Sequence, residues 1–391
     1  MKVKIISCWF NTSYAVYTNG LRQGLERELG NEVGVIASNC GCHDPMDGVF
    51  FDRNCEYFDF PHMGYWRSNN PVKRWIRLSG RQVLYHERAK KYLQRTGDAD
   101  VLHFQQTLNA YGSLTLFNWL KMPSDAARVV TVHELDDYQQ DYPKTNLTYN
   151  LADRIMVHAG DLKESLVALG VQRELIDVVE HGVDLGAAPA AGEERRGIIF
   201  YGGHKINAGK GLETLCQAIA RVRERLGTAA APCLKIFGYY GEDTRSYGQR
   251  CADEAGIADQ VQWLNRLEPD EIAREFRRSE LCVLPFIGSF AGMAAGMAMA
   301  NGVPVIGTRR AGLPEHLGDA GMWIEPKDVD GLATAIVDLM LDRNLRDGMI
   351  AKGLARARDV LNWDAVARKT LDSYGKAVER CKMPAARKVV S

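Results

Sequence analysis

The sequence has no excess charge of either sign, because 49 Lys and Arg residues are balanced by 49 Asp and Glu residues. A protein that attracts nucleic acid through its overall field carries a basic excess, so no nucleic-acid partner is expected. The N-terminus, residues 1–6, lacks the long apolar segment and the cleavage site of a signal peptide. Nine cysteines without such a signal are most simply free thiols in a reducing compartment, which predicts a cytoplasmic protein.

A continuous membrane span is also lacking. Residues 289–307 are long and almost uncharged, with the sequence S-F-A-G-M-A-A-G-M-A-M-A-N-G-V-P-V-I-G. Asn301, Gly302 and Pro304 interrupt this stretch, which argues against a membrane helix. We expect instead a helix over roughly 292–301, then a turn and a short buried strand. Small side chains on that helix allow other backbone or a ligand to come close.

Standard metal-binding spacings are missing as well. Asp98-Ala99-Asp100 has the form of an Asp-x-Asp metal motif, but it precedes a strand in the wrong architecture. Cys40-Gly41-Cys42-His43, with Cys55 nearby, contains zinc-ligand residue types at a spacing that is not typical of zinc sites. We therefore expect neither a metal ion nor another cofactor.

What the sequence does contain is a regular alternation of strand-like runs and helical periodicity, beginning with a strand at 3–7 and a helix at 14–29. This alternation predicts an α/β fold with parallel, doubly wound sheets of the Rossmann type. The pattern fails at 185–197, whose Gly, Ala and Pro content is typical of a linker, and then restarts with a strand at 197–201.

The chain accordingly divides into an N-terminal domain at 1–184, a linker at 185–197, a second domain at 198–361 and a last helix at 362–380. Asn362-Trp363-Asp364 gives that helix an N-cap-like start. Two α/β domains joined in this way place a ligand cleft between them, near the carboxyl ends of the strands.

A glycine-rich basic loop follows the first strand of the second domain, with the sequence Y-G-G-H-K-I-N-A-G-K-G over 201–211. Gly203 opens the backbone, and Lys205 and Lys210 lie five residues apart before an amphipathic helix. Two cations at a strand–loop–helix junction suit a diphosphate. The alternative is a solvated surface loop, since the spacing is not that of a P-loop.

A second anion-binding element is predicted at the start of the helix near 292. The backbone N–H groups of Gly292, Met293 and Ala294 would lack intrahelical partners and would point at an anion. Ser289 and Ser13 can add hydroxyl groups. Two helix N-termini and two lysines could thus converge on one diphosphate.

Taken in order, these motifs resemble the retaining glycosyltransferases of the GT-B fold, in the large family 4 (group 1). The resemblance covers nearly the whole chain, although each motif alone is weak. It rests on residues 131–134, 152–166, 181–184, 203–211, 285–304, 312–315, 318–321 and 362–363 with the following helix. It implies an acceptor-binding first domain, a donor-binding second domain and a last helix that crosses back onto the first.

The sequence departs from the family at the donor helix, which usually carries two glutamates eight positions apart. Counted back from Gly302-Val303-Pro304, these positions are Ser289 and Met297. In the family the second glutamate grips the nucleotide ribose, so another residue must hold the ribose here or the donor is unusual. Glu315 is the candidate replacement and Glu325 a weaker one.

His133 follows a predicted strand, and the resemblance implies that it touches the donor sugar or positions its leaving group. The alternative is a histidine that caps a strand end. His103 occupies a similar place one strand earlier, and we expect His158 and His181 to be structural.

One segment is locally basic: residues 67–95 contain nine Lys or Arg residues and one acid, interleaved with aromatic and aliphatic side chains. A basic amphipathic stretch can contact an anionic membrane or an anionic acceptor. Contact with a membrane would make the protein peripheral to the inner face of that membrane. In the resembled family this region borders the acceptor site. The alternative is a solvated helix face.

The resemblance therefore implies retaining transfer of a sugar from an activated sugar diphosphate, such as a nucleotide sugar, to a hydroxyl or amine of a small-molecule or lipid-linked acceptor. Three alternatives remain: a non-nucleotide donor such as phosphoribosyl diphosphate, a non-catalytic homologue that binds sugar phosphates, and an epimerase on the same fold. The candidate catalytic residues are His133, Lys205 and Lys210, and the candidate donor-binding residues are Ser13, Gly203, Ser289, Gly292, Met293, Ala294 and Glu315.

Overall fold

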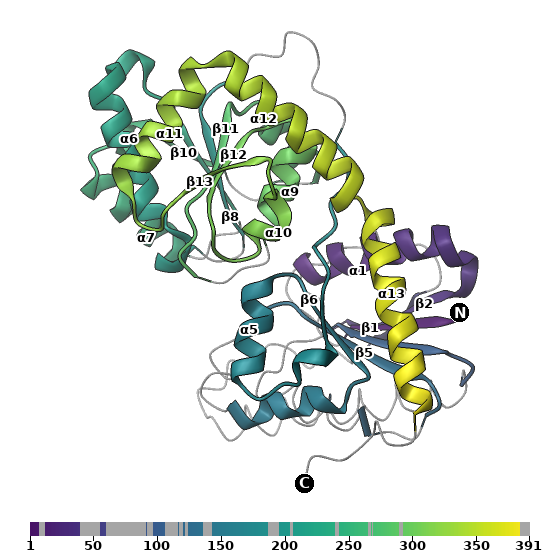
Figure 1. Ribbon diagram of the computed structural model, residues 1–391. Helices are drawn as coiled ribbons and strands as arrows, with labels where there is room; N and C mark the ends of the chain where they lie inside the picture. Colours follow the sequence, from purple (N-terminus) through teal and green to yellow (C-terminus); the bar gives the residue numbers. More distant parts are fainter. Residues whose placement is uncertain are drawn as a thin grey trace. The chain divides into compact units, whose positions relative to one another are not determined.

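The computed structural model describes residues 1–7, 12–39, 55–59, 91, 97–105, 116, 120–121, 124–135, 143–186, 195–203, 206–238, 242–264, 267, 269–288 and 292–383. They form two compact units (Figure 1). Unit 1 comprises Met1–Val179 together with Trp363–Ser391, and unit 2 comprises Glu180–Asn362.

Unit 1 is built on a sheet of seven strands, all parallel to their neighbours. The chain order reverses at β1, which pairs with β2 on one side and β4 on the other, so a topological switch point lies between β1 and β4. In spatial order the strands are β3 (Cys55–Asp59), β2 (Val33–Asn39), β1 (Val3–Ser7), β4 (Val101–Gln105), β5 (Ala127–Val132), β6 (Arg154–Val157) and β7 (Ile176–Val178).

Helices cover both faces of this sheet, which explains why its strands read as nearly continuous apolar runs. Helices α1 (Thr12–Leu29) and α13 (Trp363–Lys382) lie side by side on one face, over Ile5 and its neighbours (Figure 1). Ile6, the next residue of β1, belongs to the cluster on the other face, with Leu162 of α5 (Gly160–Ala168). Unit 1 also has 3₁₀ segments at Gly30–Glu32, Pro143–Leu151 and Arg173–Leu175.

Unit 2 repeats the plan with six parallel strands, and its switch point lies between β8 and β11. The spatial order is β10 (Val261–Leu264), β9 (Leu234–Gly238), β8 (Ile198–Gly203), β11 (Leu281–Leu284), β12 (Val305–Thr308) and β13 (Gly321–Ile324). Its helices are α6 (Leu212–Leu226), α7 (Glu242–Glu254), α8 (Pro269–Arg277), α9 (Met293–Ala300), α10 (Leu313–Leu317), α11 (Val329–Leu341) and α12 (Arg343–Arg356), which continues as a π-helical turn at Ala357–Leu361. Single 3₁₀ turns occupy Ala208–Lys210, Thr228–Ala230 and Ala258–Gln260.

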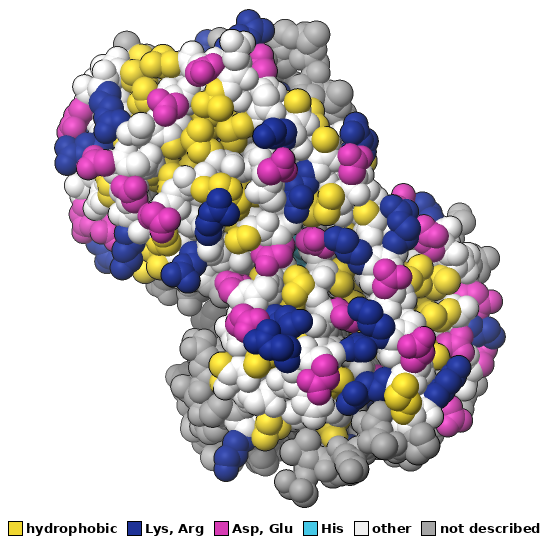
Figure 2. All heavy atoms as spheres, viewed as in Figure 1, with side chains coloured by type: hydrophobic (Ala, Val, Ile, Leu, Met, Phe, Trp, Pro, Cys, Tyr) yellow, Lys and Arg dark blue, Asp and Glu magenta, His cyan; other side chains and the backbone are white. Residues whose placement is uncertain are grey.

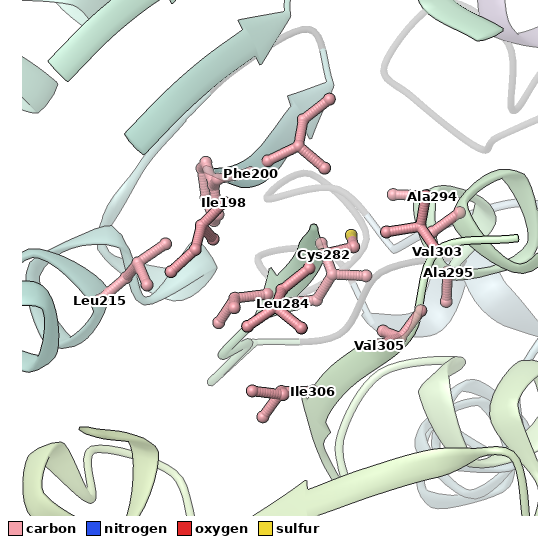
Figure 3. Close-up of a cluster of buried hydrophobic side chains, with 14 of the residues drawn as sticks. Ile198, Phe200, Leu215, Cys282, Leu284, Ala294, Ala295, Val303, Val305 and Ile306 are labelled. Atoms are coloured by element: carbon pink, nitrogen blue, oxygen red, sulfur yellow. The ribbon is translucent and has the colours of Figure 1, made fainter. Parts of the chain in front are cut away.

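The helices of unit 2 form two groups, α6, α7 and α11 in one and α8, α9, α10 and α12 in the other (Figure 1). Figure 3 shows the core that they share with the sheet, in which the small side chains Ala294 and Ala295 of α9 lie beside Val303 and Val305. The other labelled members are Ile198, Phe200, Leu215, Cys282, Leu284 and Ile306. The Gly- and Ala-rich stretch is therefore a closely packed core helix followed by a strand.

The two parallel, doubly wound sheets confirm the predicted fold class. Within the described residues no helix is both long and apolar enough to cross a membrane. Basic and acidic side chains are interspersed on the face that Figure 2 shows. The cysteines at 40–43 and all of the basic segment 67–95 except Lys91 lie outside the described residues, and the predicted linker is described only at its two ends.

Close packing of α1 against α13 depends on glycine. A β-carbon added at Gly20 would overlap the indole ring of Trp363, the first residue of α13, and one added at Gly24 would overlap the Trp363 carbonyl oxygen. Trp363 is 5% exposed, and its ring centroid lies 5.7 Å from that of Tyr17. The helix that returns to unit 1 after unit 2 is thus seated directly on α1.

We predict that Gly20→Ala lowers the free energy of unfolding of unit 1 by about 1–3 kcal/mol, because the indole ring has to move out of a filled space. The matched control is Gly375→Ala in α13, where an added β-carbon meets nothing within 4 Å. Alanine is favoured over glycine inside a helix by about 0.5–1 kcal/mol, so this control is expected to be neutral or stabilising. Thermal unfolding of both variants measures the difference, and an equal effect of the two changes would contradict the packing argument.

Candidate functional site

One candidate site lies at the switch point of unit 2, where β8 and β11 both end. Gly203 is the last residue of β8 and pairs with Gly238 of β9. The carbonyl oxygen of Gly209 accepts hydrogen bonds from the backbone N–H groups of Ile287, at 2.8 Å, and Gly288, at 3.0 Å. These two bonds join the basic loop after β8 to the loop after β11.

Lys210 belongs to the 3₁₀ turn that this junction holds in place. Its Nζ lies 4.6 Å from the centroid of the Phe286 ring, and the side chain is half-buried. A cation over an aromatic face is attracted by the ring quadrupole, which restricts the positions that a flexible lysine takes. The ammonium group is therefore held beside the carboxyl end of β11.

Gly211 is required at the end of the same turn. Its φ is +71°, and an added β-carbon would overlap the carbonyl oxygen of Pro285. Helix α6 starts directly afterwards, with Gly211 at its N-cap position. The glycine of the predicted phosphate loop thus allows the close approach of the two loops and the immediate start of the helix.

Helix α9 begins close to this junction, four residues after Gly288. Its N-cap is Gly292, in the left-handed conformation with φ +70°, and within the described part of the chain no side chain caps this end. Helical geometry leaves the first-turn amides, which include Met293 and Ala294, without intrahelical acceptors, and the helix dipole makes this end attractive to anions. The structure therefore places Lys210 and the α9 N-terminus after two adjacent strands of one sheet.

His316 packs against the same helix end and was not singled out by the sequence reasoning. A β-carbon at Gly292 would lie 2.9 Å from His316 Nδ1 and 2.8 Å from the carbonyl oxygen of Gly312, and His316 Nδ1 donates to that oxygen at 2.7 Å. Burial lowers the pKa of His316, and the hydrogen bond to Gly312 opposes this effect. The signal in the sequence was a histidine inside an apolar run, directly after Glu315.

The structure describes the side chains of only some of the residues that were considered as ribose or diphosphate partners. Met297 is half-buried and packs against the unit 2 core, so that position offers no carboxylate. Glu315 lies half-buried on α10, whose N-cap Gly312 touches Gly292, and its backbone oxygen accepts from Arg356. Lys205 and Ser289 lie outside the described residues. Ser13 lies in α1 of unit 1, and its side chain is outside the described part.

Unit 1 contains a candidate site of its own, a buried hydrogen-bond network near the carboxyl ends of β4, β5 and β6. His133 is 8% exposed, and its Nε2 lies 2.8 Å from Gln105 Oε1, while its Nδ1 lies 3.2 Å from His158 Nε2. His158 Nδ1 donates to the carbonyl oxygen of Val179 at 2.9 Å. Tyr17 packs on both imidazoles, with centroid distances of 5.0 Å to His133 and 4.8 Å to His158.

The network continues from Gln105 to His103 and α13. Gln105 Nε2 lies 3.1 Å from His103 Nε2, which is also 2.7 Å from Thr131 Oγ1. His103 Nδ1 lies 2.6 Å from the hydroxyl oxygen of Tyr374. Burial, with a smaller contribution from nearby His158, lowers the pKa of His103 to about 3, so this imidazole is neutral. The sequence predicted His133 as a site residue but not that His103, Gln105 and His158 would be joined to it.

The Asp-x-Asp segment has local partners in unit 1. Asp98 pairs with Lys2 Nζ at 2.5 Å, and the backbone N–H of Lys2 donates to Asp100 at 2.8 Å. Among the described side chains, no three His, Cys, Asp or Glu groups come together as metal ligands would.

Comparison with known proteins defines first the class and then the family. The solved structure of a sucrose-phosphate synthase from Thermosynechococcus elongatus matches with a TM-score of 0.75 at 18% identity, over 96% of this chain and 99% of that one. An Anabaena protein, HepE, solved in complex with UDP, matches with a TM-score of 0.67 at 14% identity, over 96% and 100% of the two chains. The architecture is the GT-B fold.

Both units match glycosyltransferase families in sequence. Residues 15–187 match the family described as "Glycosyltransferase Family 4", and residues 195–342 match "Glycosyl transferases group 1". The chain belongs to the family 4, or group 1, glycosyltransferases. A curated relative, the MMP alpha-(1->4)-mannosyltransferase of Mycolicibacterium hassiacum, is 29% identical over 236 residues, which are 59% of this chain and 55% of the relative. The chain thus spans about half of the length of that relative.

We predict that unit 1 loses stability in acid because His103 is neutral in the folded protein. The unfolded chain takes up a proton near the ordinary pKa of 6.5, whereas the folded pKa is about 3, so stability is complete above pH 6.5 and is lost as the pH falls. This group alone accounts for about 2 kcal/mol between pH 7 and pH 5. Urea unfolding at both pH values, read by hydrogen exchange of β4 and β5, measures the loss. An unchanged pH dependence in His103→Gln would show that His103 is not its source.

Proposed function

We propose that the protein is a retaining glycosyltransferase that moves a sugar from a nucleotide sugar to a hydroxyl or amine of its acceptor. The observation that carries the proposal is the junction at the unit 2 switch point, where the Gly209 carbonyl oxygen joins the Lys210 turn to the loop that leads into α9. A lysine and a helix N-terminus after adjacent strands suit the diphosphate of such a donor.

The chemistry follows from the leaving group. Breaking the bond between the sugar and the diphosphate develops negative charge on the phosphate oxygens, and preorganised donors act on the transition state in which that charge appears. Among the described groups, Lys210 and the first amides of α9 stabilise this charge in the proposed reaction. Lys205 is assigned the same role from the sequence. No metal ion has a part in the proposed reaction.

Retention is proposed from the family resemblance and from the character of the leaving group. A diphosphate departs without a strong general acid, and attack on the same face of the sugar, assisted by a phosphate oxygen, needs no enzymic nucleophile. His133 is proposed to touch the donor sugar or to position the leaving group. Its two ring nitrogens already face Gln105 and His158, so this role depends on how those partners hold it.

The donor class rests on the relatives. HepE was solved with UDP, and the Mycolicibacterium hassiacum relative is a mannosyltransferase, which favours a nucleoside diphosphate sugar here. Glu315 is proposed to replace the ribose contact of the family's second glutamate, because it lies on α10 next to His316, which meets the α9 N-cap Gly292. We further propose a small-molecule or lipid-linked acceptor.

We predict that Lys210→Ala reduces the rate of nucleoside diphosphate release from a panel of UDP- and GDP-sugars by about 100- to 1000-fold, as expected for the loss of one electrostatic donor. The fold should persist, because Lys210 is half-buried on a turn that backbone bonds hold. The matched control is Lys352→Ala, an exposed lysine on α12 of the same unit, which should retain full activity. A folded Lys210→Ala protein with normal turnover would remove Lys210 from the site.

The absence of an acid at Met297 gives a second prediction. With a nucleotide sugar as donor, Met297→Glu should strengthen binding of a nucleoside diphosphate by about 1–3 kcal/mol, the worth of a charged hydrogen bond to a ribose hydroxyl. Met297→Gln has the same size without charge and should give a smaller gain. Calorimetry with UDP, GDP and phosphoribosyl diphosphate measures all three proteins. Binding of phosphoribosyl diphosphate, and of no nucleotide, by the wild type would overturn the nucleotide-sugar assignment.

A further inference from the structure

Gln105 occupies a special place in unit 1, because its amide group lies between two histidines. The side chain is 3% exposed, with its oxygen 2.8 Å from His133 Nε2 and its nitrogen 3.1 Å from His103 Nε2. An amide has an acceptor at one end and donors at the other, and a half-turn of its terminal group exchanges them. Each orientation therefore imposes a different proton arrangement on the histidines.

With the Gln105 oxygen toward His133, three consecutive hydrogen bonds each require a hydrogen on an imidazole nitrogen. His133 Nε2–H donates to Gln105, His158 Nδ1–H donates to the Val179 carbonyl oxygen, and the 3.2 Å contact between His133 Nδ1 and His158 Nε2 needs a third. Two neutral imidazoles supply only two N–H groups. All three bonds form together only when the His133–His158 pair holds one extra proton.

With the Gln105 amide turned, the hydrogen bonds need one imidazole hydrogen fewer. The Gln105 nitrogen donates to His133 Nε2, His133 Nδ1–H donates to His158 Nε2, and His158 Nδ1–H donates to Val179. These bonds need two imidazole hydrogens, which two neutral rings supply. His103, at the other end of the Gln105 amide, accommodates both orientations. The hydroxyl groups of Thr131 and Tyr374 face His103, and each of them can donate or accept.

We propose that Gln105 is a positioning residue that sets the proton content of the His133–His158 pair, with one extra proton when its oxygen faces His133 and none when its nitrogen does. The kinetic consequence rests on the proposed function, which puts His133 beside the donor. In that role, a proton on the pair adds positive charge to the residue that touches the sugar or positions its leaving group. The proton count itself follows from unit 1 alone.

In the described part of unit 1, two phenols and a third imidazole lie close to the pair. Tyr17 of α1 faces both rings, and Tyr374 of α13 faces His103. Burial raises the pKa of both phenols, so they stay neutral, and burial lowers the pKa of His103 to about 3. The acid next in the chain is Glu134, directly after His133.

Two substitutions of Gln105 should act in opposite directions. In Gln105→Glu the carboxylate only accepts and carries negative charge, so the pair should keep its extra proton to a pH about 1–3 units higher than in the wild type. In Gln105→Met the acceptor is gone at similar volume, so the pair should lose that proton at a lower pH than in the wild type. Nitrogen-15 NMR of the imidazole side chains in the full chain, followed over pH, reads both midpoints directly.

The control is Thr131→Val, which removes a partner of His103 and leaves Gln105 and His158 in place beside His133, so the midpoint of the pair should stay as in the wild type. Unchanged midpoints in Gln105→Glu and Gln105→Met, or shifts in the same direction, would overturn the proposal. If Gln105→Met does not fold, the upward shift in Gln105→Glu remains a complete test.

The pH profile of kcat distinguishes a failure of the Gln105 proposal from a failure of the proposed function. The pH profile of kcat for nucleoside diphosphate release should move with the NMR midpoint, upward in Gln105→Glu and downward in Gln105→Met. Shifted midpoints with no glycosyl transfer in any protein would keep the role of Gln105 and reject the function. Shifted midpoints with an unmoved pH profile would reject the kinetic part of the proposal and leave the function standing.

Discussion

The carbonyl oxygen of Gly209 is the point on which the arrangement of the unit 2 site depends. By accepting from two consecutive amides, of Ile287 and Gly288, it fixes the loop after β8 to the loop after β11. Gly211 is a glycine because the carbonyl oxygen of Pro285 occupies the space of a side chain. The Lys210 turn and the loop that leads toward α9 thus take their places from backbone bonds at the switch point of the sheet.

The loop and the helix start at this switch point were predictable, because they depend on local signals. Glycines and lysines between an apolar strand and an amphipathic helix indicate a loop at the carboxyl edge of a parallel sheet, and Gly292 before a run of small residues indicates a helix start. The same signals gave the fold class, since alternating strand and helix patterns allow few arrangements other than doubly wound parallel sheets. His316 was missed because its role comes from the approach of α10 to α9, which no local pattern contains.

The network in unit 1 was beyond sequence reasoning for the same reason. Gln105, His133 and His158 stand at or just after the ends of three strands that are neighbours in the sheet and far apart in the chain, and His103 lies within the first of these strands. Strand order and register bring these residues together, and no single segment of the sequence determines either one. His133 could be chosen from the sequence for its position after a strand. Its two hydrogen-bond partners decide what it can do, and the sequence did not predict them.

The division of the chain has a consequence for how the protein is made. Unit 1 is discontinuous, since Glu180–Asn362 form unit 2 before Trp363–Lys382 return to cover α1 and the sheet. During synthesis the ribosome completes all of unit 2 while the α1 surface at Gly20 and Gly24 still lacks Trp363. Domains usually fold in the order in which they emerge, but here the second unit is complete first. The N-terminal unit closes its core, with Trp363 and Tyr374, only when the last helix leaves the ribosome.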